Sequence, residues 1–219
     1  TPLYSSAASD VYKRQSIQCL HTLTKKLLVK RSHRGALEIE GQEPLLKINR
    51  DGAVEEITLP SRLYAHQMIE EAMLAANVSA ASFMKKHYKF GVYRNHEEPD
   101  NVKLESLKTF FSLKGFSKSF KKSPLELVNQ CLGHAKEHKL DKVLQTVVLQ
   151  SLKRAEYSTK EVGHFGLQLE RYSHFTSPIR RYPDLMTHRM IKNILKKENT
   201  VFNKDEIAVS YTHLRAHET

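Results

Sequence analysis

The amino-acid sequence predicts an α+β fold that is rich in helix and carries a small, mostly antiparallel β element. Two observations support this class. Residues 36–40 and 45–49 alternate apolar and polar side chains, and Asp51 with Gly52 supplies a turn between two candidate strands. From residue 61 onward the apolar side chains recur mainly at helical spacing. Together the patterns predict a few strands packed by long helices.

The first helix is predicted over Ser16 to Arg34, where apolar side chains alternate at helical spacing with lysines and arginines and Gly35 ends the pattern. The longest helical pattern follows Ser61, whose side chain can cap the helix, and its apolar face continues for about six turns. Glu70 and Asn77 lie seven residues apart on this helix. At about 100° per residue they project from nearly the same face.

Shorter elements are predicted in the rest of the chain. They are an extended stretch at residues 89–96, three helices at residues 102–113, 124–138 and 141–154, and an irregular aromatic stretch at residues 157–176. Helical spacing then returns, and Pro183 lies within it. Because Pro183 lacks an N–H, the pattern allows either a bent helix that starts near Ser177 or a short turn before a helix whose first residue is Pro183.

Arg180 and Arg181 lie near the N-terminal end of this last helix in both alternatives. Cations there oppose the helix macrodipole by roughly 0.3 to 1 kcal/mol each unless an anion is bound. The free N–H groups after Ser177, together with a guanidinium that donates two parallel hydrogen bonds, suit a phosphate. The alternative is a surface ion pair between Arg180 and Asp184, worth roughly 0.3 kcal/mol. The pattern leaves both interpretations open.

Length and composition narrow the class of protein. A chain of 219 residues is expected to form one domain, since domains average roughly 150 residues. The formal net charge is +11 and the pI is about 9.6, so a polyanion is the expected partner. Two cysteines cannot form a disulfide framework, and no apolar run reaches the roughly 18 residues of a membrane helix. The sequence therefore predicts a soluble, cytoplasmic protein. Charge alone does not distinguish RNA, DNA or an acidic membrane surface as the polyanion, although no membrane partner is expected.

Two further patterns have structural alternatives. Cys131, His134 and His138 lie at i, i+3 and i+7 of a predicted helix, as metal ligands can. A fourth ligand is not apparent in the sequence, so no metal site is predicted. Phe175 and Tyr182 can either pack in the core or stack on a nucleic-acid base.

Both ends of the chain differ in pattern from the sequence between them. Ser5 to Gln15 back-translates into a transposase adapter used to prepare sequencing libraries, and Val209 to Thr219 back-translates into the opposite adapter. We therefore expect residues 1–15 and 208–219 to be adapter-derived tails, and residues 16–207 to be the natural sequence.

Four stretches resemble one protein family. The longest is "HFGLQLERYSHFTSPIRRYPDLMTHRMI", residues 164–191, which closely resembles the signature near the end of the catalytic domain of the ribonuclease II and ribonuclease R family. "MIEEAMLAANVSAASF" resembles the family's Glu-Glu helix, "GVYRNHEEP" its following strand, and "SHRGALEIE" its hairpin. The resemblance implies that residues 16–207 are the C-terminal portion of an RNB exoribonuclease domain.

The resemblance also implies a function. Members of this family are hydrolytic, processive 3′-to-5′ exoribonucleases that degrade single-stranded RNA to nucleoside 5′-monophosphates. Arg180 is implied to be the catalytic residue that binds the phosphate at the scissile end and neutralises charge in the transition state. Glu70 is implied to hydrogen-bond the ribose hydroxyls of the 3′-terminal nucleotide. RNA contacts are further expected at the matching positions Asn77, Arg94, Ser177, Arg181 and Tyr182.

The metal-binding part of the family's active site is expected to lie outside this sequence. The resemblance implies two divalent metals, Mg²⁺ in the intact parent, bound by an aspartate-rich motif that precedes all four stretches. The aspartates of this chain are isolated from one another in sequence. Two-metal hydrolysis needs these ions, so the chain alone is expected to be inactive although its parent is an enzyme. The parent is expected to be monomeric and associated with RNA-degradation machinery.

The alternative function is a non-catalytic, basic module that binds RNA or scaffolds a degradation complex. The sequence does not distinguish a ribonuclease II from a ribonuclease R subtype.

Overall fold

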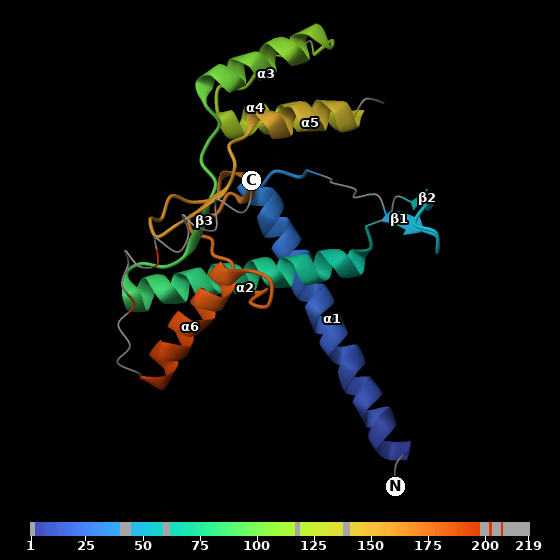
Figure 1. Ribbon diagram of the computed structural model, residues 1–219, viewed down its shortest axis with the longest axis vertical. Coiled ribbons are helices and arrows are strands. Elements are labelled where there is room, and N and C mark those ends of the chain that lie inside the picture. Colours follow the sequence, from blue (N-terminus) through green and yellow to red (C-terminus); the bar gives the residue numbers. More distant parts are fainter. Residues whose placement is uncertain are drawn as a thin grey trace. The chain divides into compact units, whose positions relative to one another are not determined.

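The computed structural model describes the backbone of residues 3–39, 45–58, 62–116, 119–137, 141–197, 202 and 207 (Figure 1). Side chains are described for these residues except 3–10, 141 and 142. The chain forms two compact units, one of residues 1–30 with 38–72, the other of residues 31–37 with 73–219. No helix among the described residues is long and apolar enough to cross a membrane.

The first unit contains most of helix α1 (Leu3–Arg34). The helix ends as predicted at Gly35, which adopts the left-handed conformation with φ of +72°. It begins at Leu3 rather than at Ser16, so the predicted start is wrong. Residues 3–34 include neither glycine nor proline, and nothing in their sequence would therefore end the helix at Ser16.

The β element of the first unit is an antiparallel hairpin of β1 (Leu45–Ile48) and β2 (Val54–Thr58). The predicted turn is confirmed. Asn49 Oδ1 accepts the backbone N–H groups of Asp51 at 3.0 Å and Ala53 at 2.9 Å, and Gly52 has a φ of +82°.

The segment between α1 and the hairpin differs from its prediction. A strand was predicted over residues 36–40, yet residues 36–39 have no regular structure, and residue 40 lies outside the described residues. Ala36 and Leu37 are buried, and the Leu37 N–H donates to the Gly166 carbonyl at 2.8 Å. The alternation of apolar residues therefore reflects burial of this segment and not a strand pair.

Helix α2 (Tyr64–Tyr88) contributes residues to both units and is the long helix predicted after Ser61, a residue that lies outside the described part. Its second half buries Ala80, Ala81 and Met84. Lys85 and Lys86 occupy its last turn, where cations stabilise the macrodipole.

The core of the second unit joins this half of α2 to the C-terminal helix. Strand β3 (Tyr93–Asn95) pairs antiparallel with β4 (Glu156–Ser158), and helix α6 (Tyr182–Lys196) follows a short 3₁₀ turn, η1 (Phe165–Leu167). The buried cluster consists of Met84, Val92, Met186, Met190 and Ile207. Because the first four of these residues come from α2, the β3 region and α6, their packing fixes the segment that enters α6.

Three further helices of the second unit form a group: α3 (Asn101–Leu113), α4 (Pro124–Glu137) and α5 (Asp141–Ser151). All three were predicted, with ends that differ by a few residues. On α4, burial raises the pKa of the Cys131 thiol to about 12, and the His134 ring contacts Phe111 and Phe116. Cys131 and His134 thus pack in this core, and His138 lies outside the described residues.

Candidate functional site

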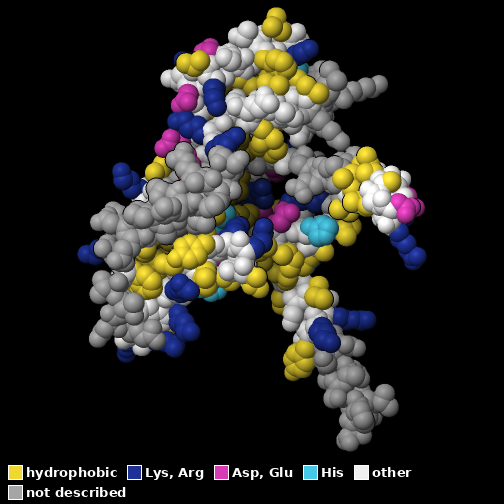
Figure 2. All heavy atoms as spheres, in the orientation of Figure 1, with side chains coloured by type: hydrophobic (Ala, Val, Ile, Leu, Met, Phe, Trp, Pro, Cys, Tyr) yellow, Lys and Arg dark blue, Asp and Glu magenta, His cyan; other side chains and the backbone are white. Residues whose placement is uncertain are grey.

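Basic side chains do not by themselves locate a site. Figure 2 shows lysine and arginine side chains scattered over the described parts of the visible face rather than gathered in one patch. The site must therefore be located from the contacts of particular residues.

The start of α6 determines where the two predicted arginines lie. The helix begins at Tyr182, with Arg181 as an extended N-cap residue and Pro183 in the first turn. A turn precedes it, closed by the Arg181 N–H, which donates to the Ser177 carbonyl at 3.1 Å. The structure thus confirms the second alternative, a short turn before the helix, which begins one residue before Pro183.

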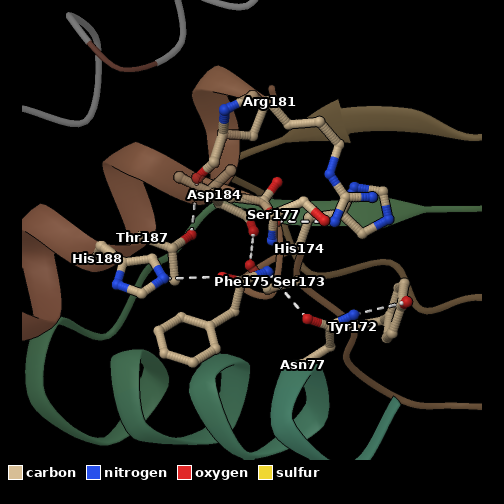
Figure 3. A network of polar contacts seen from close by, with 12 residues as sticks. Asn77, Tyr172, Ser173, His174, Phe175, Ser177, Arg181, Asp184, Thr187 and His188 are labelled. Atoms are coloured by element: carbon tan, nitrogen blue, oxygen red, sulfur yellow. Dashed lines mark hydrogen bonds and ion pairs between the residues drawn. The ribbon is translucent and has the colours of Figure 1, made fainter. Parts of the chain in front are cut away.

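Asp184 pairs with Arg181 and not with Arg180. Its Oδ1 lies 2.8 Å from Nη2 of Arg181, and the same oxygen accepts the Ser177 N–H at 2.8 Å (Figure 3). The Asp184 side chain is fully buried. Of the two interpretations left open by the sequence, the ion pair between Arg180 and Asp184 is therefore wrong: Arg180 precedes the helix, so the i, i+4 spacing of a helical pair does not apply to it.

Arg180 is exposed at the tip of the turn, next to the fully exposed Ile179. Within the described part of the chain, no side chain forms a hydrogen bond or ion pair with its guanidinium. Arg181 is neutralised by Asp184, whereas Arg180 remains available to an anion at the positive end of α6.

The segment before the turn is fixed by side chains from α2 and α6. Asn77 Oδ1 accepts the Phe175 N–H at 2.9 Å, and its Nδ2 donates to the Tyr172 hydroxyl at 2.9 Å. His188 Nε2 lies 2.8 Å from the Phe175 carbonyl, and since a carbonyl only accepts, this nitrogen carries the proton. The Phe175 and His188 rings stack with centroids 4.1 Å apart. Both backbone groups of Phe175 are thus satisfied by side chains.

Replacing Asn77 with Ala is expected to lower the free energy of unfolding by about 1–3 kcal/mol, because it leaves the Phe175 N–H without its acceptor. Ser79→Ala is the matched control, since Ser79 is exposed on the same helix and bonds only the Ala75 carbonyl. Urea unfolding of both variants measures the difference. Equal stability of the two variants would contradict the role of the buried Asn77 side chain as acceptor for the Phe175 N–H.

A row of aromatic and imidazole rings lies beside this segment. The rings of His96 and His164 have centroids 5.0 Å apart, those of His164 and Tyr172 5.4 Å, and those of Tyr172 and His174 5.5 Å. Tyr157 continues the row, with its hydroxyl 2.6 Å from Nδ1 of His174. Sequence reasoning found no site here, and the signal present was the histidine-rich aromatic stretch at residues 157–176.

The histidines of this row are held neutral. Burial, followed by the neighbouring His96, lowers the pKa of His164 to about 3. Burial and then the nearby Arg181 lower the pKa of His174 to about 4, and burial also lowers the pKa of His96. Accordingly, Nδ1 of His96 accepts the Gly166 N–H at 3.1 Å, as an unprotonated ring nitrogen must.

The other predicted site residues divide between the two units. Arg94, in the second unit, lies over the Tyr157 ring with Cζ 4.4 Å from its centroid. Tyr182 is 38% exposed at the start of α6. Glu70 belongs to the first unit, where it forms an ion pair with Arg62. The second unit therefore brings together the predicted residues Asn77, Arg94, Ser177, Arg180, Arg181 and Tyr182.

Comparison with known proteins identifies relatives for most of the chain. Ribonuclease R of Vibrio parahaemolyticus is 40% identical over 184 residues, a match that covers 82% of this chain and 22% of that protein. Ribonuclease R of Escherichia coli K12 is 38% identical over 184 residues with the same coverage. The chain thus spans about a fifth of the length of these curated relatives.

A solved structure shows the same fold. Mycoplasma genitalium RNase R in complex with ribose-methylated single-stranded RNA superposes with a TM-score of 0.77 and 26% identity, covering 87% of this chain and 30% of that chain. The helix-rich α+β fold is thus shared with part of an RNase R. The RNB domain family model matches residues 4–197, and the chain belongs to this family. The match begins within residues 1–15, whose adapter origin stays a prediction.

Proposed function

We propose that this chain is the phosphate-binding portion of an RNB domain, and that its intact parent is a processive 3′-to-5′ exoribonuclease. The parent would degrade single-stranded RNA to nucleoside 5′-monophosphates. The observation that supports this proposal is Arg180, exposed at a helix start and without a partner among the described residues, on a turn whose neighbouring arginine is already neutralised.

The proposed role of Arg180 is electrostatic. Its planar guanidinium can donate two parallel hydrogen bonds to phosphate oxygens, and the start of α6 adds the positive end of the macrodipole. Charge grows on these oxygens as the phosphodiester bond breaks, so a fixed cation stabilises the transition state more than the bound substrate. Tyr182 and Arg94 would supply further contacts to the RNA strand, and Asn77, Ser177 and Arg181 would support the turn.

Glu70 is proposed to recognise ribose. A carboxylate can accept hydrogen bonds from the 2′- and 3′-hydroxyls of a terminal nucleotide, and the 2′-hydroxyl distinguishes RNA from DNA. In the described chain this carboxylate pairs with Arg62, and both side chains are partly exposed, so an incoming nucleotide can compete for it.

The described residues do not fit a resident Mg²⁺ ion. No group of three histidine, cysteine, aspartate or glutamate side chains among them is arranged to bind a metal. Asp184, the buried carboxylate next to the turn, already accepts hydrogen bonds from Ser177 and Arg181 through one oxygen. We therefore propose that the Mg²⁺ ligands of the parent lie outside this chain and that the chain alone does not cleave RNA.

Incubating the 219-residue chain and its intact parent separately with internally labelled single-stranded RNA and Mg²⁺ tests this proposal. Steady release of nucleoside 5′-monophosphates is expected from the parent and none from the chain. Release of nucleotides by the 219-residue chain would contradict the proposal that this chain alone does not cleave RNA. A parent that binds the RNA but releases no nucleotide would favour the alternative, a non-catalytic RNA-binding module.

A further inference from the structure

One oxygen of Asp184 fixes both ends of the turn that carries Arg180. Oδ1 accepts the N–H of Ser177, where the turn begins, and lies 2.8 Å from Nη2 of Arg181, where it ends. The backbone bond from the Arg181 N–H to the Ser177 carbonyl closes the same turn at 3.1 Å. Ile179 and Arg180 form the exposed tip between these fixed points.

Burial makes this arrangement rigid. Asp184 is fully buried at the third position of α6, and its helix packs through Met186 and Met190 into the core of the second unit. Figure 3 shows the Asp184 carboxylate directed at Ser177 and the His188 ring directed at Phe175, both from α6. The Asp184 carboxylate therefore couples the position of the tip to α6.

We propose that Asp184 is the positioning residue for Arg180: it sets the direction of the exposed guanidinium without touching the RNA. This inference rests on the proposed function, because it assigns to Asp184 an effect on phosphate binding by Arg180. A displacement of about 1 Å at a reacting centre can lower turnover by about 10²-fold, so loss of the fixed turn has a measurable cost.

The two oxygens of the Asp184 carboxylate have different surroundings, and this difference allows a positioning role to be distinguished from a role that needs the negative charge. Oδ2 is buried and has no hydrogen-bond partner among the described residues, so Oδ1 makes both contacts. An asparagine side chain retains an oxygen that can take the place of Oδ1 but carries no charge. Asp184→Asn should therefore preserve the turn, whereas it would abolish a role as general base and weaken a role as metal ligand.

The test measures RNA turnover and RNA affinity in the intact parent for Asp184→Ala, Asp184→Asn, Arg180→Ala and the double variant Arg180→Ala/Asp184→Ala. Asp184→Ala is expected to lower kcat by about 10²-fold with little loss of affinity, and Asp184→Asn by about tenfold or less. In the Arg180→Ala background, Asp184→Ala should lower kcat no further, because its effect acts through Arg180.

Thr187→Val is the matched control for the loss of a buried hydrogen bond. Thr187 is fully buried on the same helix, and its hydroxyl donates to the Pro183 carbonyl at 2.9 Å, away from the turn. The control is expected to lower thermal stability while leaving kcat unchanged. If Asp184→Ala does not fold, the test uses the kcat of Asp184→Asn, which is expected to stay within about tenfold of the unmodified protein.

The outcomes distinguish the positioning role of Asp184 from the phosphate-binding role of Arg180. Normal turnover in Arg180→Ala would overturn the role of Arg180 itself. Slow turnover in Arg180→Ala with normal turnover in Asp184→Ala would overturn only the positioning role. Additive effects of Arg180→Ala and Asp184→Ala, or an Asp184→Asn variant as slow as Asp184→Ala, would likewise contradict positioning through the turn.

Discussion

Replacing Arg180 with Ala in the intact parent is expected to lower kcat by about 10²–10³-fold, the usual effect of removing one fixed donor from a transition-state site. RNA affinity should fall much less, because the interaction strengthens as charge develops on the phosphate. Single-turnover kinetics with labelled RNA, measured beside equilibrium binding, separate the two effects. Equal losses in binding and turnover would indicate a simple phosphate anchor.

Two further variants separate the geometry of the Arg180 guanidinium from its charge. Arg180→Lys keeps the charge but not the planar pair of donors, so it should recover only part of the turnover. Arg189→Ala is the matched control, because Arg189 is also exposed on the C-terminal part of the chain and lies on α6 itself. It removes the same charge and should leave kcat close to that of the unmodified protein.

Acidification from pH 7 to pH 4 is expected to lower the free energy of unfolding by several kcal/mol. The pKa of His164 is lowered to about 3 and that of His174 to about 4, whereas both titrate near pH 6.5 in the unfolded chain. Below pH 6.5 the unfolded state therefore binds more protons, and stability falls until the pH reaches the folded pKa values. Each tenfold difference in proton affinity corresponds to about 1.4 kcal/mol.

Urea unfolding at several pH values between 7.5 and 4 measures this dependence. His174→Phe removes one titrating ring from the buried row and should flatten the stability profile below pH 6.5. His87→Gln removes an exposed histidine from the end of α2 and should leave the profile unchanged. If stability fell equally steeply with pH in the unmodified protein and both variants, the pH dependence could not be assigned to the buried histidines.

Local patterns predicted the elements that depend on nearby residues. Gly35 ends α1 because it can adopt a positive φ, and the Asp51-Gly52 turn forms the hairpin for a similar reason. Spacing alone was misleading at residues 36–39 of the strand predicted over 36–40: these residues form no strand, and their apolar alternation accompanies burial of Ala36 and Leu37. Spacing also offered Arg180 as a partner for Asp184, whereas Arg181 forms the ion pair, because the position at which α6 begins decides which arginine can reach Asp184.

The candidate site could be predicted only in part. The family signature identified Arg180 and its neighbours, since they are contiguous in sequence. The partners of Asn77 lie 95 and 98 residues further along the chain, and no periodicity links such distant positions. The buried row from His96 to His174 is similarly assembled from separate segments, so its neutral histidines become visible only in the folded protein.

The backbone N–H groups of Phe175 and Ser177 are both satisfied by side chains from helices, Asn77 of α2 and Asp184 of α6. The direction of Arg180 therefore depends in part on Asn77, which lies outside the signature of residues 164–191. Relatives with an identical signature can consequently differ in the direction of this arginine if α2 differs. Arg180 could thus be redirected by changing α2 while residues 164–191 stay the same.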